Sequence, residues 1–275
     1  MTIPSYLVGD REVLEAVARQ HWQAVYLGDK TVLCRILGKY IVYTDAEDVG
    51  ITPHLCLNGY WEPWITVAIA RMLKPGWYCV DVGANHGYYT TIMADAVGPA
   101  GHVLAIEPNP RLIELLKFTL EVNGFQGYTA TLQKAISHSD NQKVNLVIPR
   151  NRGLNATLCR EALASDGAVE VETATLDNVT KEWAHVDLVK IDAEGAEEMI
   201  WHGMRQTLER NPNIHVIMEI NCARYADPES FVRDIQEAGF VLRYIDYDCT
   251  IKNITQKQIL TDRVGEDWML FLYRA

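Results

Sequence analysis

The sequence lacks several patterns that would assign a protein to a specialised class. Its six cysteines are scattered and none lies in a C-x-x-C pair, so we expect neither a disulfide framework nor a zinc site. No apolar window approaches the length of a membrane span. Residues 1–10 show no basic region followed by a long apolar one, so we expect no signal peptide, no membrane partner and a cytoplasmic location.

Positive charge is also scarce. The chain has no lysine or arginine run, and its formal net charge at pH 7 is −11. Because affinity for nucleic acids depends on basic surface, we expect no nucleic-acid partner. The 275 residues suffice for one large domain with a small extension. We expect residues 1–57 to form that extension, with a helix from Arg11 to about Tyr26 and a β-hairpin of Thr31–Leu37 and Tyr40–Thr44, packed on a main domain of residues 58–275.

The stretch D-V-G-A-N-H-G, from Asp81 to Gly87, is the first strong signal. It follows an apolar, strand-like run and precedes a helical one, which is how a nucleotide-type βαβ unit begins. Gly83 and Gly87 allow a sharp bend and close approach to a ligand. The third glycine of G-x-G-x-x-G is missing, which disfavours an NAD-dependent oxidoreductase. An acid before this short turn suits a ligand with a cationic amino-acid end.

The next strands continue the same unit. His102–Ile106 is a predicted strand, and Glu107 at its end can accept two ribose hydroxyls. Residues 128–136 are predicted to form the third strand. Residues 143–148 and 169–175 are predicted to form an extra pair of strands, separated by a polar loop over 149–164 that either contacts substrate or is simply solvated. Two final strands, residues 241–245 and 268–273, are expected to close the sheet as an antiparallel pair.

Carboxylates follow two later strands. The strand 186–191 leads into D-A-E-G-A-E, and the strand 214–220 ends at Glu219. Because strand ends meet at one edge of an open α/β sheet, Asp192, Glu194 and Glu219 are expected to converge. Such a cluster is either a general base whose pKa is raised by like charge or a divalent cation site. Alternatively, Glu194 and Glu197 only favour a helix N-terminus electrostatically.

Three motifs together resemble the FkbM-type family of S-adenosylmethionine-dependent methyltransferases: D-V-G-A-N-H-G at 81–87, E-P at 107–108 and K-I-D-A-E-G-A-E at 190–197. The resemblance runs from roughly residue 50 to 220. It implies an α/β, Rossmann-like class I methyltransferase fold with a seven-stranded, mostly parallel sheet and an antiparallel final strand. It also implies S-adenosylmethionine as the cofactor and S-adenosylhomocysteine as its product.

The resemblance implies a cofactor site as well. Asp81 would lie near the methionine ammonium, Glu107 would take the ribose hydroxyls, and Ala135 to Ser137 would border the adenine. His86 is interpreted as a packing residue and not as a base. The full set of expected cofactor-binding residues is Glu62, Asp81, Gly83, Ala84, Asn85, Gly87, Tyr89, Glu107, Pro108, Ala135, Ser137 and Asp192.

The family most often methylates hydroxyl oxygens of natural products or glycans, so the acceptor is expected to be a small molecule, a glycan or a peptide. Asp192 is the first choice for the base, followed by Glu194 and Glu219. A divalent cation is compatible with these acids, but none is predicted. Two alternatives stay open: carboxyl methylation of a small molecule or peptide, which needs no base, and a binding protein that keeps the fold without turnover. The sequence does not determine the oligomeric state.

Overall fold

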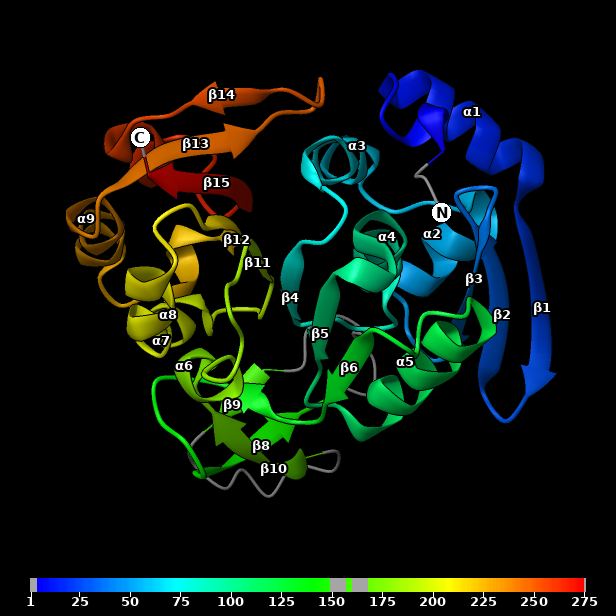
Figure 1. The fold of residues 1–275 in the computed structure, drawn as a ribbon, viewed down its shortest axis with the longest axis horizontal. Coiled ribbons are helices and arrows are strands. Elements are labelled where there is room, and N and C mark those ends of the chain that lie inside the picture. Colours follow the sequence, from blue (N-terminus) through cyan, green and yellow to red (C-terminus); the bar gives the residue numbers. More distant parts are fainter. Residues whose placement is uncertain (1–3, 149–156, 160–167, 275) are drawn as a thin grey trace.

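The computed structural model describes residues 4–148, 157–159 and 168–274. Its central sheet has eight strands: Tyr78–Val82 (β4), His102–Ile106 (β5), Thr129–Leu132 (β6), Leu188–Ile191 (β11), His215–Ile220 (β12), Phe240–Ile245 (β13), Ile251–Asn253 (β14) and Trp268–Arg274 (β15). They lie in the order β14-β13-β15-β12-β11-β4-β5-β6 (Figure 1). The five neighbouring strands from β12 to β6 are parallel. The carboxyl ends of β4, β5 and β11, at Val82, Ile106 and Ile191, therefore lie along one edge of the sheet.

The last strand runs against its neighbours, as predicted. β15 is antiparallel to both β12 and β13. The predicted total of seven strands is wrong by one, because the short β14 adds an antiparallel edge strand beside β13. This strand lies in the polar segment after Ile245, where three residues are too few to produce an apolar alternation that a sequence pattern could reveal.

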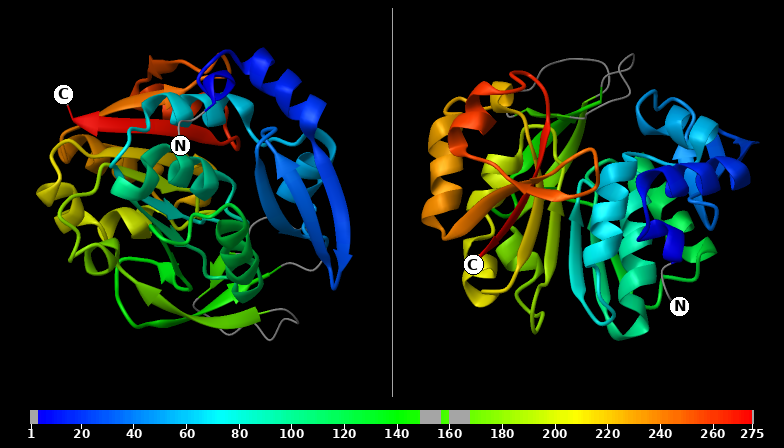
Figure 2. Two further views of the ribbon diagram at one scale, coloured as in Figure 1. Left: turned by 45° about the vertical axis from the view of Figure 1, so that its right-hand side comes forward. Right: turned by 90° about the horizontal axis from the view of Figure 1, so that it is seen from above.

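Helices cover both faces of the sheet: Pro63–Met72 (α3), Tyr88–Val97 (α4), Pro110–Val122 (α5), Leu176–Val179 (α6), Glu197–His202 (α7), Arg205–Arg210 (α8), Pro228–Glu237 (α9) and Gln256–Thr261 (α10). One apolar cluster joins α3–α5 to one face, and a second joins α7–α9 to the other (Figure 2, right). Alternate strand residues supply each cluster; Cys79 belongs to the first and Val80 to the second. The all-buried strand β11 follows from this double cover.

The helical segment after Asp192 consists of two helices, α7 and α8, separated at Gly203. A Cβ atom at Gly203 would lie 2.1 Å from the Ser137 carbonyl oxygen, so the break brings this glycine against another segment. Met199, on α7, is only partly buried.

The predicted third strand over 128–136 is wrong in extent. It ends at Leu132, and Ala135–Ile136 (β7) joins a second sheet with Lys143–Val147 (β8), Thr157–Cys159 (β9) and Ala168–Ala174 (β10), in the order β7-β10-β8-β9. β7 leaves the main sheet because Ala135 packs with Leu146 and Val171 in a small separate core. The predicted pair of β8 and β10 is confirmed. Apart from β9, the loop predicted over 149–164 lies outside the described residues.

The N-terminal part contains Arg11–His21 (α1), Gln23–Gly28 (β1), Thr31–Ile36 (β2), Tyr40–Asp45 (β3) and Ile51–Asn58 (α2). The hairpin of β2 and β3 is confirmed. The first helix is shorter than predicted, because Trp22 is extended and the following residues form β1, which pairs with β2. This sheet stands outside the main-domain helices (Figure 2).

Side chains of the main domain hold the outer edge of β3. The Asn123 side-chain amide accepts from the Ile41 N–H at 3.1 Å and donates to its carbonyl at 2.6 Å. Thr119 Oγ1 accepts from the N–H of Tyr43 at 3.0 Å. The Nε2 atom of the fully buried His86 accepts from the N–H of Asp45 at 3.0 Å. His86 therefore packs in the interior and also forms a hydrogen bond to the backbone of the hairpin.

None of the helices in the described ranges combines the length and apolar character that crossing a membrane requires.

Candidate functional site

The turn from β4 to α4 is tied to its neighbours on both sides. The N–H groups of Gly83 and Ala84 both donate to the Ile106 carbonyl at 3.0 Å. Gly83 has φ +77°, and a Cβ atom there would lie 1.9 Å from the carbonyl oxygen of Asp192. Gly87 has φ +87°, and its Cβ would lie 2.3 Å from Leu116 Cδ1. These glycines are therefore required by packing inside the protein, a reason beyond the predicted approach to a ligand.

Asp81 lies beneath this turn and is 1% exposed. Its Oδ2 accepts from Thr90 Oγ1 at 2.6 Å, while Oδ1 has no hydrogen-bond partner among the described residues. Burial raises the pKa of Asp81, and the Lys190 ammonium beside it on β11 opposes that rise. A buried carboxylate oxygen without a donor is costly. The ammonium end of a bound amino acid would supply one.

Glu107 follows β5 and is 6% exposed. Its Oε2 accepts from the N–H of Asn85 at 3.0 Å, and its Oε1 accepts from the N–H of Asn109 at 2.9 Å. Burial raises its pKa to about 7, although both N–H groups favour the ionised form. Each carboxylate oxygen retains capacity for another donor, so the geometry fits a pair of hydroxyls.

Glu62, the residue before α3, faces the same edge. Its backbone is left-handed, with φ +36°, and its Oε2 accepts from the hydroxyl of Tyr89 at 2.8 Å. Burial and the charge of Asp192 raise the pKa of Glu62 to about 7. The Lys190 ammonium lies 4.7 Å from the Tyr89 ring centroid. Glu62 and Tyr89, both among the expected cofactor-binding residues, are thus in contact with each other.

The three predicted carboxylates converge as expected. One oxygen from each of Asp192, Glu194 and Glu219 lies within 4.8 Å of the others, a spacing that could hold a cation. Lys190 Nζ donates to Asp192 Oδ2 at 3.1 Å. Burial and the charge of Asp192 raise the pKa of Glu194 to about 7 and also raise the pKa of Glu219. With a pKa of about 7, Glu194 gains or loses its proton near neutral pH.

Arg224 is a residue of this site that sequence reasoning missed. It lies on the short 3₁₀ helix Cys222–Arg224 (η3) after β12. Its Nη2 lies 3.0 Å from Glu194 Oε2 and 3.2 Å from Asp267 Oδ1, and its Nη1 lies 3.1 Å from Glu219 Oε2. The guanidinium of Arg224 therefore lies among the carboxylates of the cluster. The one sequence signal for its role is that Arg224 follows Glu219 closely along the chain.

Glu197 has a different role from the electrostatic one considered for it. It is fully buried, and its carboxylate accepts from the N–H of Ala193 at 3.0 Å and of Gly195 at 2.9 Å. The Tyr225 hydroxyl donates to the same carboxylate at 2.6 Å. These bonds hold the turn in which Glu194 has a left-handed φ of +54°. Glu197 is thus a positioning residue for Glu194.

The residues expected to border the adenine belong to the second sheet, and their contact with the donor stays a prediction. Ala135 and Ser137 are buried at and just after β7 in the second sheet, and Ser137 Oγ lies 4.0 Å from Met199 Sδ. Within the described ranges, no hydrogen bond joins either residue to the turn of residues 83–87. Pro108 is half-buried beside Glu107.

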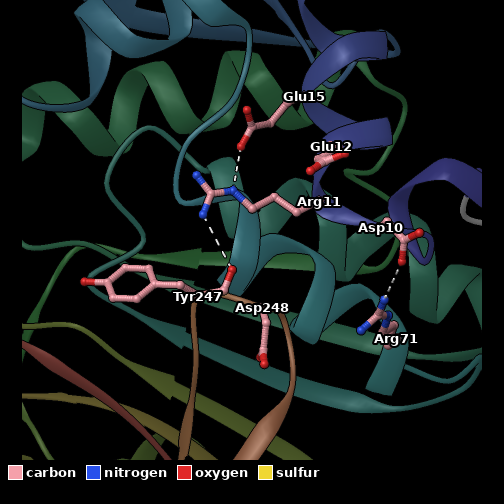
Figure 3. Close-up of a pocket in the computed structure, with 7 residues that line it drawn as sticks. All are labelled: Asp10, Arg11, Glu12, Glu15, Arg71, Tyr247 and Asp248. Atoms are coloured by element: carbon pink, nitrogen blue, oxygen red, sulfur yellow. Dashed lines mark hydrogen bonds and ion pairs between the residues drawn. The ribbon is translucent and has the colours of Figure 1, made fainter.

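A pocket of about 640 Å³ lies away from these residues, between α1, α3 and the turn after β13. Figure 3 shows its lining. Arg11 donates to Glu15 at 2.6 Å and to the Tyr247 carbonyl at 3.5 Å, so this charge is already paired inside the protein. The pocket contains none of the residues predicted from the sequence.

Comparison with known proteins gives a family match. The model of the methyltransferase FkbM domain matches residues 81–246. A protein-L-isoaspartate O-methyltransferase of Methanothrix thermoacetophila is 41% identical over 49 residues, which are 18% of this chain and 23% of that protein. The match thus spans about a quarter of this relative.

Two solved structures resemble the chain. TYW2 of M. jannaschii in complex with AdoMet is 12% identical, with a TM-score of 0.48, over 90% of this chain and 86% of that one. A SAM-dependent O-methyltransferase of Thermotoga maritima is 14% identical, with a TM-score of 0.44, over 78% of this chain and 66% of that one.

Proposed function

The chain belongs to the FkbM family of S-adenosylmethionine-dependent methyltransferases, and on this premise we propose that it methylates a hydroxyl oxygen of a natural product or glycan. One observation carries the proposal: the turn that bears the acids packs directly on the glycine turn. A Cβ atom on Gly83 would lie 1.9 Å from the Asp192 carbonyl oxygen. A donor held at the first turn and an acceptor held by the second would therefore be neighbours.

The donor end of the site is assigned to four residues. Asp81, with its unpartnered Oδ1, is proposed to receive the ammonium, and Glu107 the ribose hydroxyls. Glu62 and Tyr89, joined by a hydrogen bond, are proposed to line the methionine end. When bound, S-adenosylmethionine supplies an activated methyl group. The chain's own part is then to hold the acceptor in line and to take its proton.

We assign the proton-accepting role to Glu194. A general base works best when its pKa lies near the working pH, and the pKa of Glu194 is raised to about 7. Asp192, ranked first from the sequence, is paired with Lys190 and contributes through its negative charge, which raises the pKa of Glu194. The proton of the acceptor hydroxyl would pass to a carboxylate oxygen of Glu194, and Arg224 would fix that side chain.

A second candidate is carboxyl methylation. The short segment shared with a protein-L-isoaspartate O-methyltransferase favours it. A carboxylate acceptor is already ionised, so it would not need Glu194 as a base.

Incubation with methyl-labelled S-adenosylmethionine and panels of hydroxyl and carboxyl acceptors tests both candidates. An ether product keeps its label in alkali, whereas a methyl ester releases it as methanol. We expect an alkali-stable product. An alkali-labile product would replace the first candidate with the second. Failure of S-adenosylmethionine to raise the melting temperature, together with no labelled product, would contradict both.

A further inference from the structure

Strand β1 forms an exposed, uncharged edge. Its residues, Q-A-V-Y-L-G, contain no charge and no proline. Val25, Tyr26 and Leu27 are 53%, 64% and 52% exposed, and Trp22 before them is 41% exposed. β1 is the last strand on its side of the β1-β2-β3 sheet. Natural proteins usually protect such an edge with charges, proline or a cover, because it can pair with another strand.

The two edges of this small sheet differ in how their outward backbone groups are hydrogen-bonded. On β3, the outward N–H groups of Ile41, Tyr43 and Asp45 are all bonded to main-domain side chains. Because those three groups point outward, the residues between them pair with β2. Alternation across the sheet then fixes which groups of β1 point outward.

In the β1–β2 register, Gln23 lies opposite Arg35 and Val25 opposite Leu33, so these two residues of β1 bond to β2. Ala24 and Tyr26 therefore turn their N–H and carbonyl groups to the open side. Among the described residues, no backbone bond outside the ladder uses these groups.

We propose that β1 pairs with β1 of a second copy of this chain, antiparallel and about a two-fold axis at Val25. In that arrangement Ala24 of each copy lies opposite Tyr26 of the other, and each such pair exchanges two backbone hydrogen bonds. The two three-stranded sheets become one six-stranded sheet. Such a contact is isologous, so it closes at the dimer.

Two features favour a second copy over a different partner. The outward groups at 24 and 26 are symmetric about residue 25, so the strand complements itself in the antiparallel direction. Charge is compatible with this contact: β1 carries no charged side chain, whereas the whole chain has a formal net charge of −11. Two acidic chains therefore meet with less repulsion along this strand than across charged surface. The exposed side chains of Trp22, Val25, Tyr26 and Leu27 would add apolar contact area beside the paired strands.

Sedimentation analysis of the full-length chain tests the proposal. We expect wild type to have twice the chain mass of 31.1 kDa and Val25→Lys to be monomeric, because two lysines would meet on the axis. Val122→Lys is the matched control: Val122 is 49% exposed on α5, on the far side of β3. It should remain a dimer. A monomeric wild type, or a dimer that Val122→Lys dissociates and Val25→Lys does not, would overturn the proposal.

Hydrogen exchange tests the register itself. In wild type, the N–H groups of Ala24 and Tyr26 should exchange slowly. In Val25→Lys they should exchange as fast as amides on an unpaired strand edge. Leu27→Lys serves as a second variant if Val25→Lys does not fold. Rapid exchange at both positions in wild type would overturn the proposed pairing. These measurements need no methyl acceptor, so they are independent of the proposed activity.

Discussion

Asp192 and Lys190 form a pair at the end of β11, with Lys190 Nζ 3.1 Å from Asp192 Oδ2. Lys190 is 1% exposed; burial disfavours its charge, but Asp192, Asp81 and Glu62 outweigh that effect and raise its pKa to about 12. The pair places one fixed negative charge next to Glu194.

Glu194→Gln should lower kcat for a hydroxyl acceptor by about 10²-fold or more, because the variant cannot take the proton. Calorimetry should show unchanged affinity for S-adenosylmethionine, since Glu194 is not assigned to the donor. Near-normal turnover in the variant would remove Glu194 from the mechanism.

Asp192→Asn should move the pH dependence of kcat to lower pH. In wild type, activity should rise through about pH 7 as Glu194 ionises. Removing the neighbouring negative charge makes ionisation easier, so the pKa of Glu194 falls. Rate profiles at saturating donor and acceptor measure the midpoint; a midpoint that stays in place or rises contradicts the role given to Asp192.

Arg224→Met should move the same midpoint in the opposite direction. The guanidinium lowers the pKa of Glu194 and Glu219, so its loss raises both. Arg224→Lys, which keeps the charge, should restore part of the shift. Equal profiles for the two variants would mean that Arg224 acts through packing and not through charge.

The sequence predicted the parallel sheet and the position of the acids well, because both depend on local patterns. Strand β5 was predicted at its observed bounds, and Asp192 and Glu194 follow an apolar strand into a turn. Once strand order is known, the ends of β11 and β12 must lie side by side. Convergence of Asp192 with Glu219 therefore needed no information on side-chain packing.

What the sequence missed depends on contacts between distant segments. Arg224 is one arginine among many until the fold sets it against Glu194 and Asp267. Strand β7 leaves the main sheet because of a small core that only the three-dimensional arrangement creates. Strand β1 continued the apolar spacing of α1, and only its pairing with β2 distinguishes it from helix.

Gly83→Ala should destabilise the fold by about 3 kcal/mol, because φ is +77° and the new Cβ meets the rigid carbonyl of Asp192. Gly124→Ala is the control: its φ is +75°, but a Cβ there meets nothing within 4 Å. The control should cost only about 1 kcal/mol. Urea unfolding compares the two, and equal losses would contradict the packing argument.

His86 should make stability fall as pH is lowered. Burial lowers its folded pKa to about 4, below the ordinary value of 6.5. Between these values the unfolded chain binds more protons than the folded one, so stability is complete above pH 6.5 and declines toward pH 4 by on the order of 3 kcal/mol. His86→Gln keeps an acceptor for the Asp45 N–H without titrating. Unfolding free energies of the two proteins should diverge as pH falls; parallel curves would contradict this.

Calorimetric titration with S-adenosylhomocysteine tests the assignment of the donor site most directly. Wild type should bind, Glu107→Gln should bind at least about tenfold more weakly because one ribose acceptor is lost, and Glu121→Gln, an exposed change on α5, should bind like wild type. Circular dichroism melting checks that each variant is folded. Absence of binding by wild type, or equal affinity in folded Glu107→Gln, would contradict the account.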